Sequence, residues 1–149
     1  MVTNQINSQY KKGAEGEKYI ATKLSDFGYK VLYVGGCQLY SITGERFYSV
    51  DLEPFKSGKT FWVQAKYKEP RKFYPDTGME LWRYKNLIEH QKESGLPILV
   101  LFTDKTTQIY GEWLNNLPAC FSMKQLNKKT NTMMIYWFLE KLKDYHDLL

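Results

Sequence analysis

The sequence predicts an α/β sandwich, in which helices cover a mixed β-sheet. A helical periodicity runs through residues 8–27, and two strand-like runs, 46–55 and 60–68, are joined by a short turn. A second helical segment, 79–94, precedes the apolar run ILVLFT at 98–103. Such a run is typical of a strand that is buried on both faces, so helices are expected on both sides of the sheet.

Length and composition favour one globular domain that spans residues 1–149. The chain is 43% hydrophobic, and it carries 21 Lys and Arg against 16 Asp and Glu, a net charge of +5. This excess favours a polyanionic partner without requiring one. Two cysteines and two histidines share no short spacing, which argues against a zinc site or a disulfide framework. The sequence has no apolar run of about 20 residues, the length that spans a bilayer, so we expect a soluble, cytoplasmic protein.

The predicted first helix carries a carboxylate on its apolar stripe. Tyr10, Ala14, Ala21 and Leu24 recur at three- and four-residue steps, and Glu17 completes this stripe. A charge taken out of water without a partner is costly, so Glu17 needs a structural or chemical reason. One alternative is a helix-edge acid that pairs with a nearby lysine.

The two strand-like runs predict a hairpin that gathers polar side chains. A two-residue turn at Ser57-Gly58 pairs Lys56 with Lys59, and counting outward sets Asp51 opposite Gln64. Opposed residues project from the same sheet face, and Lys66 follows Gln64 on that face. The hairpin therefore predicts one cluster of Asp51, Gln64 and Lys66. A one-residue bulge would break this pairing.

The remaining elements are less distinctive. We expect a loop at 68–78, a helix at 79–94 that ends at Gly95, and a short strand running into a short helix at 108–117. For the segment 132–149 the pattern fits one helix, or a strand followed by a helix, and we favour the second interpretation.

The polar cluster suits phosphodiester hydrolysis. The carboxylates of Asp51 and Glu17 and the amide oxygen of Gln64 are ligands for Mg²⁺ or Mn²⁺, because hard cations take oxygen donors. Lys66 could orient or deprotonate a water and neutralise charge that develops on phosphorus. The alternative for Asp51 and Lys66 is an exposed cross-strand ion pair, worth at most about 1 kcal/mol, but this leaves Gln64 unexplained.

These residues resemble a known family. The sequence VD at 50–51 lies thirteen residues before QAK at 64–66 and follows a helix with GAEGE, which resembles the PD-(D/E)XK nuclease superfamily. The form VQAKY is similar to that of Mrr-type nucleases, and the spacing resembles that of archaeal Holliday junction resolvases. The resemblance covers roughly residues 12–103. It implies the restriction-endonuclease-like fold, a three-layer α/β core with a mixed central sheet flanked by helices.

The resemblance also implies an Mg²⁺- or Mn²⁺-dependent nuclease. Asp51 would be the central metal ligand, Lys66 the catalytic lysine, Glu17 the helical acid that orients or bridges the metal, and Gln64 the residue at the acid-or-glutamine position. Two features depart from the family pattern: no proline precedes Asp51, and Gln64 brings no charge. The second implies weaker metal affinity, or an inactive descendant that only binds DNA.

Basic side chains around the hairpin and the second helix are candidate DNA contacts. Lys68, Arg71 and Lys72 alternate with aromatic residues, which suits phosphates and unpaired bases. Arg83 and Lys85 on the second helix could face the same cleft as the predicted cluster of Asp51, Gln64 and Lys66. The alternative for the basic run is a solvated loop.

The sequence therefore predicts a metal-dependent DNA endonuclease of recombination or repair, with a Holliday junction or other branched DNA as one candidate substrate. A single site cuts one strand, so two symmetric nicks would require a homodimer. The competing hypothesis is a non-catalytic DNA-binding or assembly module of the same fold. A third is a basic structural protein with no nucleic-acid partner, which would show no salt-sensitive DNA affinity.

Overall fold

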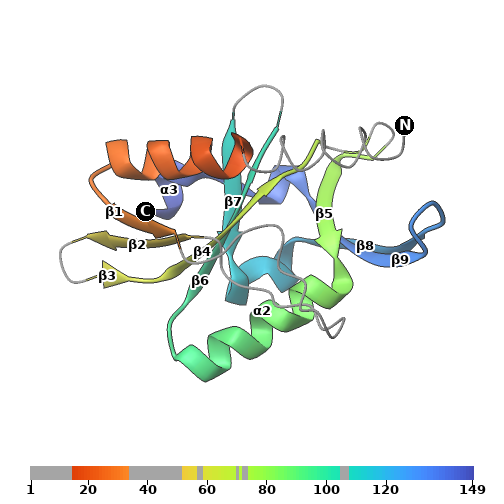
Figure 1. The fold of residues 1–149 in the computed structure, drawn as a ribbon. Coiled ribbons are helices and arrows are strands. Elements are labelled where there is room, and N and C mark those ends of the chain that lie inside the picture. Colours follow the sequence, from red (N-terminus) through yellow and green to blue (C-terminus); the bar gives the residue numbers. More distant parts are fainter. Residues whose placement is uncertain (1–14, 34–51, 57–58, 70, 72–73, 105–107) are drawn as a thin grey trace, which may run out of the picture.

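The computed structural model describes residues 15–33, 52–56, 59–69, 71, 74–104 and 108–149. Its larger sheet has seven strands in the order β1-β2-β4-β6-β7-β10, with β3 paired to β2 (Figure 1). The strands are β1 (Lys30–Tyr33), β2 (Leu52–Lys56), β3 (Lys59–Thr60), β4 (Trp62–Tyr67), β6 (Ile98–Thr103), β7 (Ile109–Trp113) and β10 (Lys143–Asp144).

The sheet is mixed, as the sequence predicts. Strands β4 and β6 are parallel, and the other pairs in this sheet are antiparallel. A parallel pair needs a crossover connection, which here includes α2 (Leu81–Ser94). The helix ends at Gly95, whose φ of 71° lies in the left-handed region that favours glycine. The predicted helix end at Gly95 is confirmed.

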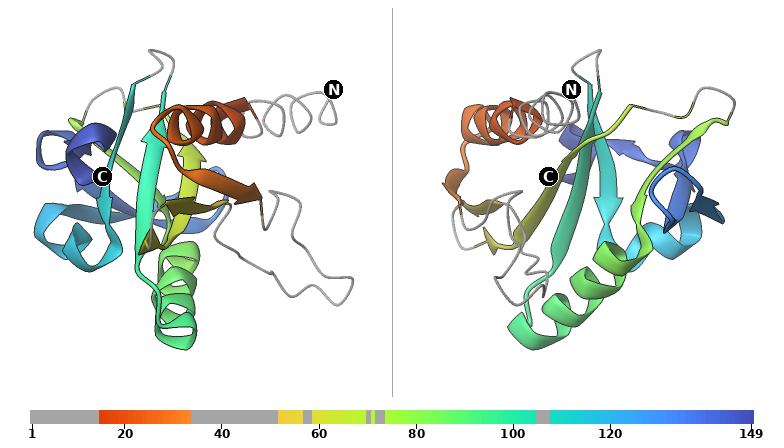
Figure 2. Two further views of the ribbon diagram at one scale, coloured as in Figure 1. Left: turned by 90° about the vertical axis from the view of Figure 1, so that its left-hand side faces the viewer. Right: turned by 45° about the vertical axis from the view of Figure 1, so that its right-hand side comes forward.

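Helices cover both faces of the central sheet. On one face, Leu99 and Leu101 of β6 belong to an apolar cluster with Ile20 and Leu24 of the helix at 15–26. On the other face, alternate residues of β6 pack in a second cluster with Leu87 of α2. Figure 2 shows the two helices on opposite sides of the strands. The result is the three-layer α/β core that the sequence predicts.

The predicted hairpin register is confirmed as far as the structure describes it. Lys56 pairs with Lys59, which is the pairing that a two-residue turn predicts. Farther along the strands, Leu52 pairs with Val63 in the same register. Phe61, which separates β3 from β4, is the one residue that interrupts the strand predicted at 60–68. Asp51 lies outside the described residues, so its predicted position opposite Gln64 remains a prediction.

A second, three-stranded sheet packs beside the first and was only partly predicted. Strand β5 lies within the stretch predicted as a loop at 68–78 and the start of the helix predicted at 79–94. That prediction was wrong, because β5 forms only by pairing with β9, more than fifty residues later in the chain. The sheet has the order β5-β9-β8, with β5 (Asp76–Glu80), β8 (Phe121–Asn127) and β9 (Thr132–Phe138).

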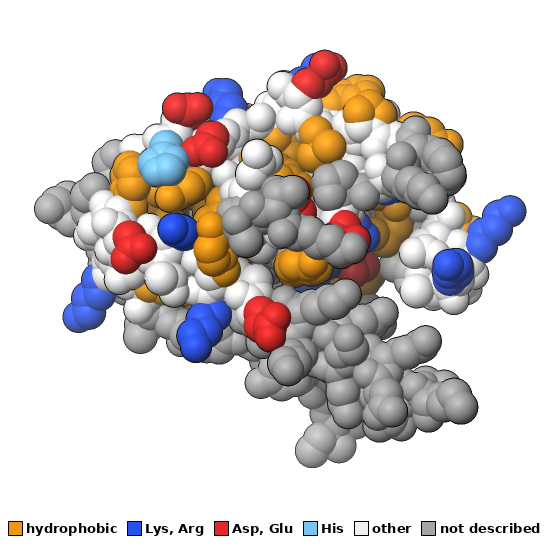
Figure 3. Space-filling model, turned by 90° about the horizontal axis from the view of Figure 1, so that it is seen from above, with side chains coloured by type: hydrophobic (Ala, Val, Ile, Leu, Met, Phe, Trp, Pro, Cys, Tyr) orange, Lys and Arg blue, Asp and Glu red, His pale blue; other side chains and the backbone are white. Residues whose placement is uncertain are grey.

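Strands β8 and β9 form a hairpin that projects from the body (Figure 1). Seen from above, Lys and Arg side chains stand out at that end of the molecule (Figure 3). The strand predicted near 132 is confirmed, whereas β8 was missed because four of its seven residues are exposed. Short elements complete the chain: the 3₁₀ helices η1 (Leu114–Cys120) and η2 (Leu139–Lys141), and α3 (Tyr145–Leu148). Within the described ranges, none of the helices combines the length and apolar character needed to cross a bilayer.

A buried ion pair holds the start of the second sheet. Asp76 is fully buried, and its two carboxylate oxygens accept hydrogen bonds at 2.7 Å from Nε and Nη2 of Arg71. Ser122 on β8 donates a further bond of 2.8 Å to Asp76. The guanidinium lies 4.0 Å from the ring centroid of Tyr74 and 3.6 Å from that of Tyr136. Because a buried carboxylate needs such partners, this network fixes where β5 begins.

We expect Asp76→Asn to lower the free energy of unfolding by roughly 3 kcal/mol, because it leaves the Arg71 charge desolvated without its counter-ion. Urea unfolding followed by circular dichroism measures the change. Asp26→Asn, at an exposed position of the helix at 15–26, is the matched control and should change stability by less than about 0.5 kcal/mol. Equal effects in both variants would contradict the structural role assigned to Asp76.

Candidate functional site

The candidate site begins on the face of β4 that points toward α2. Trp62 packs against the α2-side cluster, whereas Val63 and Ala65 belong to the opposite cluster, so Gln64 and Lys66 share the face of Trp62. Gln64 is only 1% exposed, and its Nε2 lies 3.4 Å from the carbonyl oxygen of Ala65, to which it donates. A buried amide and an ammonium thus occupy neighbouring positions of one sheet face.

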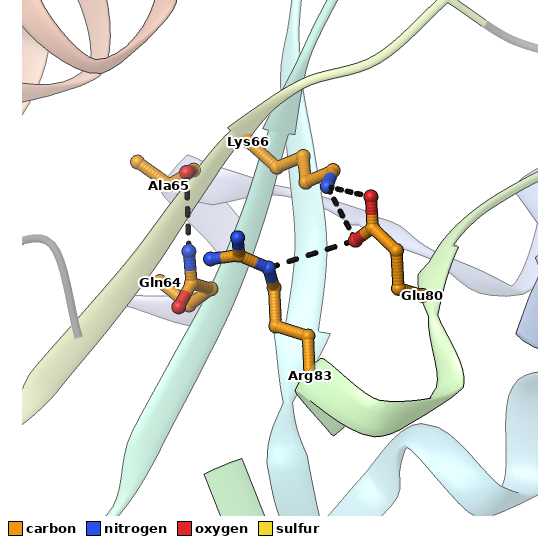
Figure 4. Close-up of polar contacts among 5 residues, drawn as sticks. All are labelled: Gln64, Ala65, Lys66, Glu80 and Arg83. Carbon is orange, nitrogen blue, oxygen red and sulfur yellow. Dashed lines mark hydrogen bonds and ion pairs between the residues drawn. The ribbon is translucent and has the colours of Figure 1, made fainter. Parts of the chain in front are cut away.

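Lys66 forms an ion pair with a carboxylate that the sequence analysis did not select. Its Nζ donates to Oε2 of Glu80 at 2.8 Å and to Oε1 at 3.2 Å. Nε of Arg83 lies 3.5 Å from the same Oε2 (Figure 4). The side chains of Lys66, Glu80 and Arg83 are 18%, 28% and 23% exposed. We refer to these three residues as the Lys66 cluster.

Burial and charge shift both members of the ion pair. Burial lowers the pKa of Lys66, and the positive charges of Arg83 and Lys68 lower it further, against the opposing effect of Glu80. Burial alone would raise the pKa of Glu80, but the charge and hydrogen bond of Lys66, together with Arg83, lower this pKa to about 2. Glu80 therefore stays ionised at neutral pH. Lys66 and Arg83 thus flank the Glu80 carboxylate, and the charge of Lys68 also acts on Lys66.

The helix at 15–26 approaches the same end of β4. A Cβ atom on Gly16 would lie 2.8 Å from Cβ of Tyr67 and 3.2 Å from Cγ2 of Thr103, the last residues of β4 and β6. Only glycine permits this approach, which brings the first described turn of the helix against the ends of both strands. Glu17, in that turn, is 8% exposed. The predicted carboxylate on the buried face of the helix is therefore present at the end of the sheet where Lys66 lies.

The other candidate residues do not all lie at this site. Asp51 and Lys72 lie outside the described residues. Lys68 is half-buried, and its backbone nitrogen donates to the carbonyl of Thr103. Arg71 takes part in the buried ion pair with Asp76, so a structural role accounts for it. Lys85 is exposed on α2, one residue past Tyr84.

Glu80 was missed because the sequence gives it an ordinary explanation. An acidic residue at the start of a helix is favoured by the helix dipole, and the helix was predicted to begin at Met79. In the structure Glu80 ends β5 and is the N-cap residue of α2, without a side-chain capping bond. The residues before it, DTGM, are all buried in a strand, but Asp76 and Gly78 are uncommon in strands, so the sequence held no clear signal for this position.

This end of β4 has donors for a hard divalent cation, although Glu17 belongs to the helix that covers the sheet face opposite to Lys66. Glu17 and Glu80 are carboxylates and Gln64 offers an amide oxygen, which are donors for Mg²⁺ or Mn²⁺ and poor ones for softer metals. In the part of the chain that the structure describes, His, Cys, Asp and Glu side chains form no group of three or more that could hold a metal ion. A site with three such ligands would thus need a side chain outside the described residues, and Asp51 is the predicted one.

Comparison with known proteins establishes the fold. Hjc from Archaeoglobus fulgidus, a Holliday junction resolvase from an archaeal hyperthermophile, has a similar solved structure, with a TM-score of 0.55. The alignment covers 87% of this chain and 85% of Hjc, at 10% sequence identity. The chain has the restriction-endonuclease-like fold.

The fold that the sequence resemblance implied is therefore confirmed. No protein-family model matches the chain, and no curated protein matches it in sequence. At 10% identity, the likeness to Hjc concerns the backbone, and the chemistry of this chain has to be argued from its own residues.

The ion pair between Lys66 and Glu80 predicts a pH dependence of stability. A carboxyl group whose pKa is lower in the folded state contributes stability above its unfolded pKa, near 4.5, and loses that contribution as the pH falls toward about 2. Glu80→Gln removes the charge and leaves Lys66 buried without a counter-ion. We expect a lower melting temperature for Glu80→Gln at pH 7, and a difference from wild type that narrows as the pH falls from 4.5 toward 2.

Thermal melts between pH 7 and pH 2.5 measure this difference. Glu89→Gln is the matched control, because Glu89 is 62% exposed and pairs with Lys92 at 3.6 Å across one turn of α2. An exposed pair of this kind contributes little, so the control should follow wild type at every pH. A gap between wild type and Glu80→Gln that stays constant down to pH 2.5 would contradict the assigned role of the pair.

Proposed function

We propose that the protein is an Mg²⁺- or Mn²⁺-dependent DNA endonuclease. The observation that supports this most is the hairpin register, in which Leu52 lies opposite Val63. If the register continues by one residue, Asp51 lies opposite Gln64, next to Lys66. Asp51, Gln64 and Lys66 would then meet on one sheet face in a restriction-endonuclease-like fold. This set combines metal-binding oxygens with a cation for the transferred phosphoryl group.

Asp51, Glu17 and the amide oxygen of Gln64 would hold the metal ion. A bound divalent cation lowers the pKa of water and stabilises negative charge on phosphate oxygens. Lys66 has three N–H donors, two of which bond to Glu80. The third can hold a water or a nonbridging phosphate oxygen. Glu80, at the end of the next strand in the chain, orients the ammonium of Lys66 and adds a carboxylate to the sheet face on which Gln64 brings no charge.

DNA is the proposed substrate, and a branched form is the first candidate. Hjc is a Holliday junction resolvase, and this chain shares its fold. The positive charge of Lys66, Arg83 and Lys68 suits the phosphate backbone, and Lys85 extends it along α2. One site hydrolyses one strand, so paired cuts in a symmetric junction would require a homodimer. Such an enzyme would serve DNA recombination or repair.

A non-catalytic DNA-binding module of the same fold is the second candidate function. Two observations favour it: Gln64 contributes no charge to a metal site, and Lys66 is bonded to Glu80. In this interpretation the Lys66 cluster stabilises the contact between the two sheets and presents positive charge to DNA. The two candidates differ in whether the site binds a metal ion.

Cleavage assays test the proposed activity. The substrates are labelled linear duplex, single-stranded, flap and four-way-junction DNA, with Mg²⁺ or Mn²⁺. We expect metal-dependent cutting by wild type, and a loss of at least about 100-fold in Asp51→Asn and Lys66→Ala. The first variant removes a ligand of the metal ion, and the second removes a cation beside the reacting phosphate. Both variants should keep their affinity for DNA. Cutting that persists in the two variants, or an absence of cutting on every substrate, would contradict the endonuclease proposal.

Metal-dependent stabilisation separates the two candidate functions without an activity assay. A ligand that binds the folded state alone raises its stability by about 2.7 kcal/mol at 100 times Kd, roughly 5–10 °C for a chain of this length. We expect Mn²⁺ to raise the melting temperature of wild type and to have little effect on Asp51→Asn. DNA binding with equal and negligible Mn²⁺ effects in both proteins would favour the non-catalytic module.

A further inference from the structure

A groove lies between α2 and the β8–β9 hairpin, next to the Lys66 cluster. It has a volume of about 390 Å³. Two of the residues that line it, Leu81 and Trp82, directly follow Glu80 in the chain. The groove is lined by Leu81, Trp82, Lys85, Asn131, Thr132 and Met133. We call it the α2 groove.

The hairpin wall of the groove combines the polar residues Asn131 and Thr132 with an exposed apolar side chain, Met133. Met133 is 42% exposed, and Leu126, which lies opposite it in the register, is 45% exposed. Farther along the same face, Ile135 is buried in the core. The core face of β9 therefore continues beyond the core into solvent, where it meets the half-buried Trp82 of α2. An indole ring and a thioether at this position form an apolar surface that suits a flat aromatic group.

The charge around the groove is positive. Lys85 lines it, and Lys128 and Lys129 lie in the turn of the hairpin, beside the lining residue Asn131. The sequence contains no Asp or Glu between Glu112 and Glu140, so this hairpin carries lysines without acidic residues. An apolar floor with cations at its rim is complementary to a nucleotide, in which a flat base is joined to an anionic phosphate.

The position of the groove fits a strand that also reaches Lys66. Glu80 pairs with Met134 across β5 and β9. Asn131 precedes Met134 by three residues, about 10 Å at the usual rise of a strand. A single DNA strand could therefore contact the Lys66 cluster and the α2 groove together.

We propose that the α2 groove binds an unpaired nucleotide of the DNA, with its base against Trp82 and Met133 and its backbone beside Lys85. The proposal rests on DNA as the substrate class, and it names the feature that this protein reads: a base that is not paired in a duplex. A paired base cannot stack on Trp82, because both of its faces are covered by neighbouring base pairs. The groove therefore selects single-stranded DNA, or branched DNA with an unpaired segment such as a flap, over linear duplex.

Binding measurements without metal test the groove separately from catalysis. Fluorescence anisotropy in EDTA compares a labelled 20-nucleotide single strand, a flap and a linear duplex. We expect Trp82→Leu to weaken binding of the single strand and the flap by about 5- to 150-fold, the loss typical for one stacked base. Affinity for the duplex should change by less than about twofold. Trp82→Phe keeps an aromatic face and should bind within about threefold of wild type.

Lys85→Ala and Lys92→Ala form a matched pair for the backbone contact. Both lysines are exposed on α2, but Lys92 lies in the last turn, away from the groove, and pairs with Glu89. Removing one phosphate contact should reduce the slope of log K against log salt by about 0.7 for a single strand. We expect this reduction in Lys85→Ala and an unchanged slope in Lys92→Ala. Circular dichroism melts establish that each variant is folded.

The outcomes separate this proposal from the proposed function. Trp82→Leu could lose equal affinity for single strand and duplex, or a folded Trp82→Leu protein could lose none. Either result would overturn the proposed role of the groove, even if wild type cleaves DNA. A loss of affinity that is confined to single-stranded and flap DNA would support the proposed role of the groove, even if no substrate is cut. A change in oligomeric state caused by Trp82→Leu, measured by sedimentation, would show that the groove holds a second copy of the chain, which also overturns the proposal. Wild-type protein that binds no DNA would overturn both.

Discussion

The complete burial of β6 is the constraint on which the rest of the fold depends. All six of its residues are buried, so each face of this strand must be covered by another element. The helix at 15–26 covers one face and α2 the other. Strand β4 pairs with β6 along its whole length, from Trp62 opposite Ile98 to Tyr67 opposite Thr103. Burying β6 therefore also fixes the position of Gln64 and Lys66 on a face that α2 covers.

The features that the sequence predicted well are those set by local patterns. The Ser57-Gly58 sequence predicts a turn in which Lys56 pairs with Lys59, and that pairing is present. Alternation along β4 then separates Val63 and Ala65 from Gln64. The uninterrupted apolar character of 98–103 predicted a strand covered on both sides. These predictions needed no knowledge of distant parts of the chain.

The features that the sequence analysis missed depend on distant contacts. Strand β5 contains Asp76 and Gly78, which are uncommon in strands, and it exists because β9 pairs with it. The same pairing explains why Glu80 faces Lys66 and not solvent. The sequence analysis explained Glu80 as an acid at the start of a helix. It therefore selected Lys66 but not Glu80, which is the counter-ion of Lys66 in the structure. The predicted position of Asp51, in contrast, depends only on the local hairpin register, and the pairing of β2 with β4 supports that register.

The ion pair between Lys66 and Glu80 joins two sheets that belong to different parts of the chain. Lys66 lies on β4 of the larger sheet, and Glu80 ends β5 of the smaller one, whose first residue Asp76 is held by Arg71 and Ser122. A small sliding of one sheet past the other would lengthen this contact and remove the carboxylate charge that keeps a proton on Lys66. The amine would then release its proton at a lower pH. The contact between the two sheets thus helps to keep Lys66 protonated.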